Sequence, residues 1–275
     1  MRSSRWGLIR YHRPERRWPA DVPGLSWGYE SRQPSGAVQG RPADPPPEIT
    51  LGRVVGDTEV MYIPAHFAAD AATLAGLLDG LAAADLVTLT PRGLVATTLP
   101  LLHEPDGGEH GRLVGHLART NDQWRHTEHE AMVIVRGGDG YISPTWYPSK
   151  AEHGRVVPTW NYLTAHVYGT LVSHDDPAWL ADLVDRLTRR HEGQLAQRTG
   201  GEPWSASDAP EAYLRGQLRA IVGVELVITR IEAKAKLSQN RPDADIDGVV
   251  SGLERAGRHD LAATVAAARP GRAVT

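Results

Sequence analysis

The chain has 275 residues, 41% hydrophobic and 23% charged, a balance typical of a folded globular protein. Its formal net charge of −3 provides no global basic field for non-specific nucleic-acid binding. The absence of cysteine excludes disulfides, thiolate metal sites, iron–sulfur clusters and a cysteine nucleophile. No window reaches the run of about 20 apolar residues that a membrane-spanning helix needs, so we expect a cytoplasmic protein.

Residues 1–60 differ in composition from the rest of the chain. They hold eight of the 20 prolines and no lysine. Such a segment cannot bury enough apolar surface to offset the entropy lost on ordering. We expect 1–60 to be either a disordered, dispensable extension or upstream sequence that precedes a true translation start at Met61.

Strands dominate the predicted structure of 61–175. The leucine spacing predicts a helix over 71–84. Alternating segments then predict strands over 85–90 and 94–101, joined by a Pro-Arg-Gly turn. Further strands are expected at 112–117, 131–135, 141–143 and 159–173. This number of short antiparallel strands indicates a small β-barrel.

Helices dominate the predicted structure of 176–275. Asp176 and Pro177 supply an N-cap and a first-turn proline for a helix that ends near Gly193. The later elements are a helix opening at Asp208, a returning strand over 224–236, and helices over 243–256 and 260–268. The sequence therefore predicts an α+β fold, a barrel core with an added C-terminal helical part.

Only three of the 30 basic residues are lysines: Lys150, Lys234 and Lys236. A compact ammonium on a flexible stem differs chemically from the planar fork of arginine. These lysines are therefore candidates for a specific role, the alternative being chance positions on a solvated surface.

A dense block of polar and aromatic residues extends from 141 to 162. Its proline-flanked turns combine flat aromatic faces with hydroxyl, amide and ammonium groups, a mixture that suits a planar phosphorylated ligand. The candidates for ligand contact are Ser143, Trp146, Lys150, Thr159, Trp160 and Asn161. The alternative, and the more common role of such tryptophans, is burial in the core.

Two further blocks have the same chemistry. The strand end and turn over 115–124 contribute His116, Arg119 and Asn121, and the segment 234–241 contributes Lys236, Ser238 and Gln239. Arginine and the free amides of a turn suit phosphate recognition. The more common explanation of the first block is an exposed arginine and an asparagine that caps the next helix, and that of the second block is a solvated turn. Together they predict one anionic site on which Arg119, Lys150 and Lys236 converge.

Signatures of several enzyme classes are missing from the sequence. It contains no zincin-like histidine pair, nucleophile elbow, P-loop or dinucleotide fingerprint, so we predict no metal site and assign no catalytic residue. His116 and His166 lie on predicted strands and are the candidates for a haem ligand. Hydrogen bonding within the core is the more frequent role of a strand histidine.

The blocks, in this order, resemble the PaiB family of FMN-binding negative transcriptional regulators. The matching motifs begin at Met61-Tyr-Ile-Pro-Ala-His-Phe67 and continue through Gly-His-Leu-Ala-Arg-Thr-Asn, Tyr-Ile-Ser-Pro-Thr-Trp-Tyr-Pro-Ser-Lys, Val-Pro-Thr-Trp-Asn-Tyr and Lys-Leu-Ser-Gln-Asn-Arg-Pro. The resemblance covers 61–256. It implies a split β-barrel, FMN as cofactor, and a homodimer with ligand sites near its interface. It also assigns part of the phosphate site to His116–Asn121.

The chain departs from this family where Thr98 and Asp139 replace two usual histidines, which puts ligand affinity and chemistry in question. Some relatives instead bind haem b and form nitrogen–nitrogen bonds in piperazic-acid synthesis, but they lack the Trp-Tyr-Pro-Ser-Lys run. The leading hypothesis is an FMN-binding repressor, and the alternative is a flavin- or haem-dependent oxidoreductase. No segment predicts a helix-turn-helix with a basic recognition helix, so we expect only weak direct DNA binding.

Overall fold

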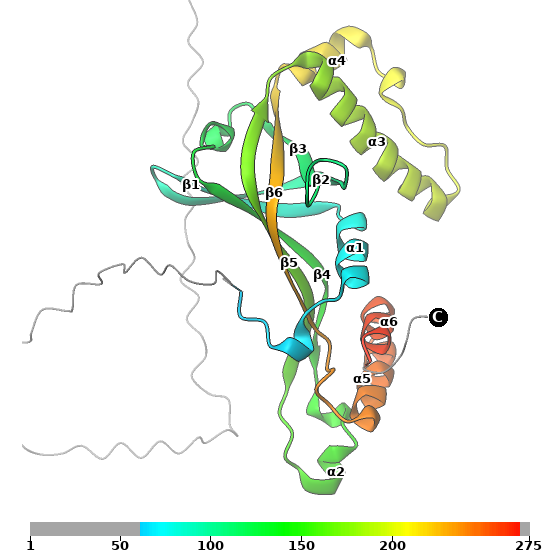
Figure 1. The fold of residues 1–275 in the computed structure, drawn as a ribbon. Helices are drawn as coiled ribbons and strands as arrows, with labels where there is room; N and C mark the ends of the chain where they lie inside the picture. Colours follow the sequence, from blue (N-terminus) through cyan, green and yellow to red (C-terminus); the bar gives the residue numbers. More distant parts are fainter. Residues whose placement is uncertain (1–60, 270–275) are drawn as a thin grey trace, which may run out of the picture. The chain divides into compact units, whose positions relative to one another are not determined.

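The computed structural model describes residues 61–269 (Figure 1). The expectations about residues 1–60 therefore lie outside the described residues. Within 61–269, no helix combines the length and apolarity needed to cross a bilayer.

Six antiparallel strands close into a barrel with the order β1-β2-β3-β6-β5-β4. Their bounds are β1 Ala83–Thr90, β2 Gly93–Glu104, β3 Arg112–Ala118, β4 Glu130–Ile142, β5 Thr159–His174 and β6 Ile221–Lys236. The expected strands 131–135 and 141–143 are one strand, β4, because a bulge between Arg136 and Asp139 carries the pairing past two glycines. The predicted α+β fold with a split β-barrel is confirmed.

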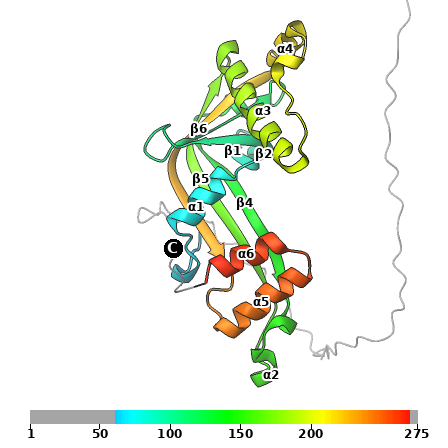
Figure 2. The same ribbon diagram turned by 90° about the vertical axis from the view of Figure 1, so that its right-hand side faces the viewer.

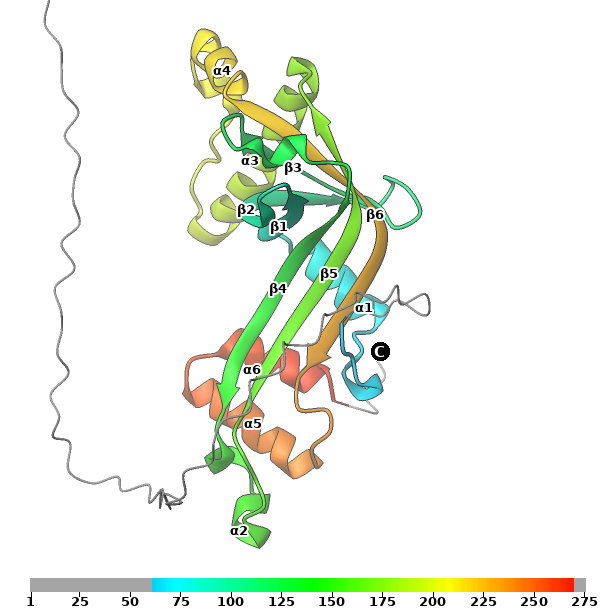
Figure 3. The same cartoon turned by 90° about the vertical axis from the view of Figure 1, so that its left-hand side faces the viewer.

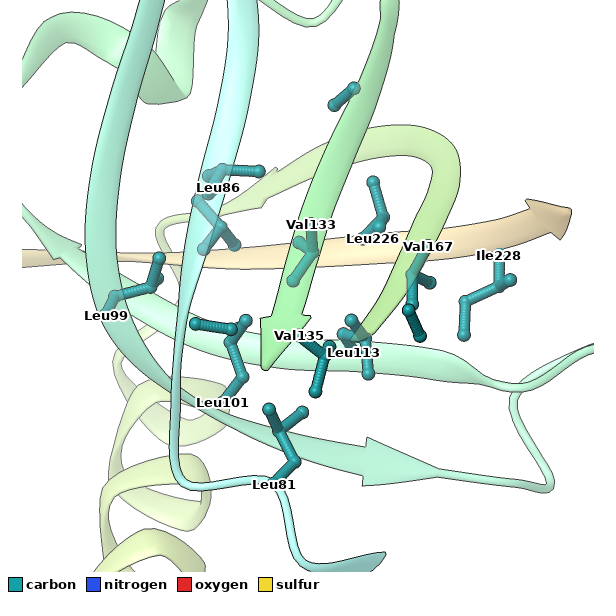
Figure 4. Packing of buried hydrophobic residues seen from close by; sticks show 14 of the residues in the cluster. Leu81, Leu86, Leu99, Leu101, Leu113, Val133, Val135, Val167, Leu226 and Ile228 are labelled. Atoms are coloured by element: carbon teal, nitrogen blue, oxygen red, sulfur yellow. The ribbon is translucent and has the colours of Figure 1, made fainter. Parts of the chain in front are cut away.

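The returning strand β6 completes the barrel, although 102 residues, 119–220, separate it from β3. It pairs with β3 on one side and with β5 on the other. Its alternate residues Val224, Leu226 and Ile228 point into the core. They meet inward-facing leucines and valines of the other strands, including Leu86, Leu101, Leu113, Val133 and Val167 (Figure 4).

Strands β4, β5 and β6 continue beyond the barrel, and a second core lies on one of their faces. Helices α5 Asp243–Arg255 and α6 His259–Ala267 pack there (Figure 2). This core contains Ile142, Tyr147, Ala235, Leu237, Ile246, Val249, Leu253 and Leu261. Helix α1, Ala71–Asp79, adds Leu77 and Leu78 to the barrel core and ends before Gly80, earlier than the predicted helix over 71–84.

Helix α3, Pro177–Thr199, covers the outside of β2 and β3. It continues through Gly193 and ends at Gly200, whose φ of 70° suits glycine. At its N-terminal end the Trp179 ring stacks on His174 at 4.1 Å between centroids. Gly223 makes room for this ring, since a Cβ there would lie 2.1 Å from it.

The remaining helical elements are short. They are η1 Ala65–Phe67, η2 Asp122–Arg125, η3 Pro144–Trp146, α2 Ser149–His153, η4 Ala206–Asp208 and α4 Glu211–Leu218. The predicted helix start at Asp208 is displaced: Asp208 belongs to a capping box in η4, and α4 begins three residues later.

Candidate functional site

The site begins with the face of the β4–β5–β6 sheet opposite α5 and α6, over which no described α-helix lies (Figure 3). Side chains alternate across a strand, so residues beside the inward Ala165 and Val167 face this way. We call it the open face. It comprises Met132, Ile134, Arg136 and Asp139 of β4, Trp160, Tyr162, Thr164, His166 and Tyr168 of β5, and Arg230, Glu232, Lys234 and Lys236 of β6.

Two of the three lysines lie on the open face. Lys236 Nζ donates to Thr159 Oγ1 at 2.8 Å, and Lys234 Nζ donates to the Tyr62 carbonyl at 2.9 Å. Lys234 also lies 5.7 Å from the centre of the Tyr162 ring. Within 61–269 neither ammonium pairs with a carboxylate. Both charges therefore remain available to an anion.

Trp160, two positions along β5 from the partner of Lys236, Tyr162, supplies a flat, half-exposed ring on the same face. Its indole Nε1 donates to Asp139 Oδ2 at 2.7 Å, and Tyr141 meets the ring edge-on at 6.3 Å. The indole borders a hollow of about 320 Å³ lined also by Arg136 and Tyr162. That volume lies at the lower end of the range of small-molecule sites. Asp139 thus holds the orientation of a stacking surface.

The other replaced histidine position lies on the same side of the barrel. Thr98 Oγ1 donates to Asp85 Oδ1 at 2.5 Å, and the same carboxylate accepts from Arg136 at 3.0 Å. These bonds cross from β2 through β1 to β4 and hold the Arg136 guanidinium. On the same face, burial lowers the pKa of His166, which favours the neutral imidazole at pH 7.

Three candidates lie where β6 ends, and their polar groups are directed inward. Asn161 and Ser238 are buried and bonded to each other, with 2.9 Å from Nδ2 to Oγ. Ser238 adopts φ 70°, uncommon for a residue other than glycine. Gln239 donates to the Ala235 carbonyl and accepts from the Leu237 amide. These bonds fix the turn that follows Lys236.

Three further candidates belong to the segment between β4 and β5. Ser143 caps η3 by accepting from the Thr145 amide. Trp146 packs against α5 at Gly248 and Gly252, so it serves the second core, as the alternative interpretation held. Lys150 is exposed on α2, outside the open face.

The remaining candidates lie at the far end of β6. Arg119 donates to Asp175 at 2.9 Å and to the carbonyl of Ile221, the first residue of β6. Asn121 donates to Thr97 Oγ1 at 3.0 Å and caps η2. His116 faces α3 and α4 on the outside of β3.

The predicted convergence of Arg119, Lys150 and Lys236 is wrong for a single chain. Arg119 bonds beside Ile221 and Lys236 ends the same strand, and at 3.3 Å per residue 15 steps of strand span roughly 50 Å. In addition, Asp175 neutralises Arg119 and raises the pKa of its guanidinium. The sequence blocks are alike in chemistry, but the strand pairing separates them.

Sequence reasoning missed Arg136 and gave Tyr162 no role of its own. The signal that could have found Tyr162 is its position midway between Trp160 and Thr164, since residues two apart on a strand share a face. Arg136 is on the same face because it pairs with Thr164. Alternation alone does not identify neighbours, because the cross-strand register sets Tyr162 opposite Lys236 and Arg136 opposite Thr164.

Comparisons with known proteins identify the family of the chain. Residues 61–230 match the family model described as "Putative FMN-binding domain". This match covers more than half of the chain, so the chain belongs to that family, whose cofactor is FMN. The expected PaiB relationship is also confirmed. Over 200 residues the chain is 32% identical to the Protease synthase and sporulation protein PAI 2 of Bacillus subtilis, covering 70% of this chain and 89% of that protein.

Other similar proteins are more distant or shorter in overlap. An uncharacterized protein of Aspergillus fumigatus is 35% identical over 156 residues, 53% of this chain, and the match spans 60% of that protein's length. Among solved structures, the conserved hypothetical protein Rv2991 from Mycobacterium tuberculosis gives a TM-score of 0.46 at 14% identity, covering 66% of this chain and 94% of that one. The FAD and haem binding protein from Mycobacterium smegmatis gives 0.41 at 19%, covering 66% and 78%.

Proposed function

We propose that FMN binds on the open face, with its ring system against Trp160 and its phosphate at Lys234 and Lys236. The observation that carries this is a pair of ammonium groups without carboxylate partners on the same face as an exposed, oriented indole. Aromatic rings stack with offset faces, and charge-assisted bonds to phosphate are the stronger class of hydrogen bond. Thr159 adds a hydroxyl at the same place.

We also propose that a second copy of the chain covers the barrel half of this face. The β1–β2 hairpin exposes Leu94 by 76% and Leu89 by 42%, and Val87 and Met132 continue the apolar surface. Contiguous apolar surface of this kind marks interaction sites. A homodimer, which the family resemblance implies, would enclose the flavin between this face and a second chain.

The regulatory role follows from the family resemblance, and it would operate without direct reading of DNA. Of the three arginines that could form a basic patch, two have acidic partners within 61–269: Arg215 pairs with Glu211, and Arg230 with Glu130 and Glu232, whereas Arg219 forms no ion pair among the described residues. We expect no footprint on a defined operator at moderate salt. Electrostatic binding at low salt should fall by about 0.9 log units per phosphate contact for each log unit of salt.

Haem is the second candidate cofactor, because His166 lies half-buried on the same face. Burial lowers its pKa, and a neutral imidazole is the form that ligates iron. A haem-bearing chain would favour the oxidoreductase alternative.

The absorption spectrum of the purified full-length chain, followed by an FMN titration, separates these proposals. Flavin bands or saturable uptake of FMN support the leading proposal. A Soret band with no uptake of FMN supports haem, and a colourless protein that takes up neither would overturn both.

A further inference from the structure

A second cavity lies on the other side of the molecule's barrel end, where α3 and α4 meet β3 and β6. It has a volume of about 270 Å³. Its lining consists of Ala181, Val184, Ala206, Leu214, Leu218 and Ile221, together with His116 and Gln217. The walls are thus apolar apart from two side chains.

The packing around this cavity is incomplete. Helix α4 has no fully buried side chain, and its Leu214 and Leu218 remain half-buried while lining the cavity. The nearby core of Leu102, Val114, Leu183 and Leu187 is sealed by Trp179 and does not include either leucine. A ligand that fits the cavity would therefore remove the remaining exposed apolar surface of these two leucines from water, which favours binding.

His116 gives the cavity a chemical preference. Neither ring nitrogen has a hydrogen-bond partner among the described residues; Nδ1 is buried, so Nε2 is the nitrogen left for a ligand in the cavity. Burial also lowers the pKa of the imidazole, so the ring is neutral at pH 7. A neutral ring in apolar walls disfavours a charged ligand, whose desolvation would go uncompensated.

We propose that this cavity binds a small, neutral, aromatic molecule carrying one hydrogen-bonding group, with that group at His116. A dry apolar cavity of about 150 Å³ already admits benzene, so this larger one can hold a two-ring molecule. The site is distinct from the flavin site, since Ile221 and Lys236 are the two ends of β6.

Two probes of matched shape test the proposal on the full-length protein. Indole carries one N–H group, and indene has the same ring shape without it. Titrations followed by ligand-observed NMR and calorimetry should show saturable binding of both, with indole the tighter. His116→Leu should weaken indole by about fivefold to tenfold and leave indene unchanged, as expected for the loss of one hydrogen bond.

A cavity-filling variant supplies the second arm. Leu214→Trp should reduce the affinity for both probes at least about tenfold by occupying the space. Tyr213→Trp, at an exposed position on the same helix, is the matched control and should bind as wild type. If Leu214→Trp fails to fold, the indole–indene comparison in His116→Leu still decides. Absence of saturable binding in the wild type, or equal binding by Leu214→Trp, would overturn the proposal. The test does not depend on FMN.

Discussion

The two faces of the β4–β5–β6 sheet are made from alternate residues of the same strands, yet they differ in chemistry. The inner face carries Ala165, Val167 and Ala235 against the barrel core and α5 and α6. The open face carries Trp160, Lys236 and their neighbours. One face therefore holds the fold together, and the other concentrates charge and aromatic surface that folding does not need.

The difference shows which residues of a motif are structural. Asn161 and Trp160 are adjacent in one motif, but Asn161 is buried against Ser238 whereas Trp160 is half-exposed and bonded to Asp139. Substitutions on the two faces should therefore change different quantities, the free energy of unfolding on one and ligand affinity on the other.

The largest effect is expected in the core that the inner face shares with α5 and α6. Leu253→Ala, at a buried position of α5, should lower the free energy of unfolding by about 2–5 kcal/mol, through lost transfer energy and the cavity left behind. Denaturant unfolding measures this change. Leu195→Ala, exposed on α3, is the control. The FMN affinity of the folded Leu253→Ala protein should equal that of wild type. A loss of FMN affinity in this variant would contradict the separation of stability and binding between the two faces.

On the open face, Lys236→Ala should weaken FMN binding by about tenfold to a hundredfold, the value of one charge-assisted contact, with little change in melting temperature. Isothermal titration or flavin fluorescence measures it. Lys150→Ala, on α2, is the matched lysine control and should bind normally. Unchanged FMN affinity in Lys236→Ala would show that this lysine is a solvated surface residue that does not contact FMN.

Arg119→Ala sharpens the same test. Because this guanidinium is engaged by Asp175 and two carbonyls, we expect a lower melting temperature and unchanged FMN affinity. A loss of affinity comparable to that of Lys236→Ala would instead indicate that the flavin site is shared between the ends of two chains.

Trp160→Leu should weaken FMN binding by a few-fold, in line with about 0.5–1.5 kcal/mol for an aromatic pair. It should also raise the fluorescence of the bound flavin, since a stacked indole quenches it. Trp204→Leu is a fair control because Trp204 is 45% exposed and Trp160 is 49% exposed. Equal fluorescence of the bound flavin in Trp160→Leu and Trp204→Leu would show that Trp160 does not stack on the flavin.

The smallest effect is expected from pH. Burial lowers the pKa of folded His166, so below about pH 6.5 the unfolded chain binds more protons than the folded one. Its contribution to stability is therefore complete above that pH and is lost as the pH falls through the folded pKa. The free energy of unfolding, measured at several pH values, should therefore depend less on pH in His166→Gln than in the wild type. An unchanged pH dependence in His166→Gln would show that burial of this ring is not linked to folding.

The local elements of this protein could be predicted from its sequence. Alternation marked the strands, and the Pro-Arg-Gly turn marked the first hairpin. The scarcity of lysine singled out Lys150, Lys234 and Lys236, of which Lys150 lies outside the open face. Local sequence predicts these elements because the spacing of apolar residues and the capping residues of a strand or helix lie within the element itself. The predicted break between two strands at 136–140 is wrong because a non-local contact, the pairing with β5, continues β4 past two glycines.

Only the tertiary structure decided which residues work together. Lys236 reaches Thr159, 77 positions away in sequence, because β5 and β6 pair with Tyr162 opposite Lys236. The same strand β6 carries Ile221, a partner of Arg119, at its opposite end. Alternation defines two faces of a strand without saying which one is covered. Here α5 and α6, following β6 in the chain, cover one face, and the physical reason is that burying their apolar residues against Ala235 and Ile142 leaves Trp160 and Lys236 outward.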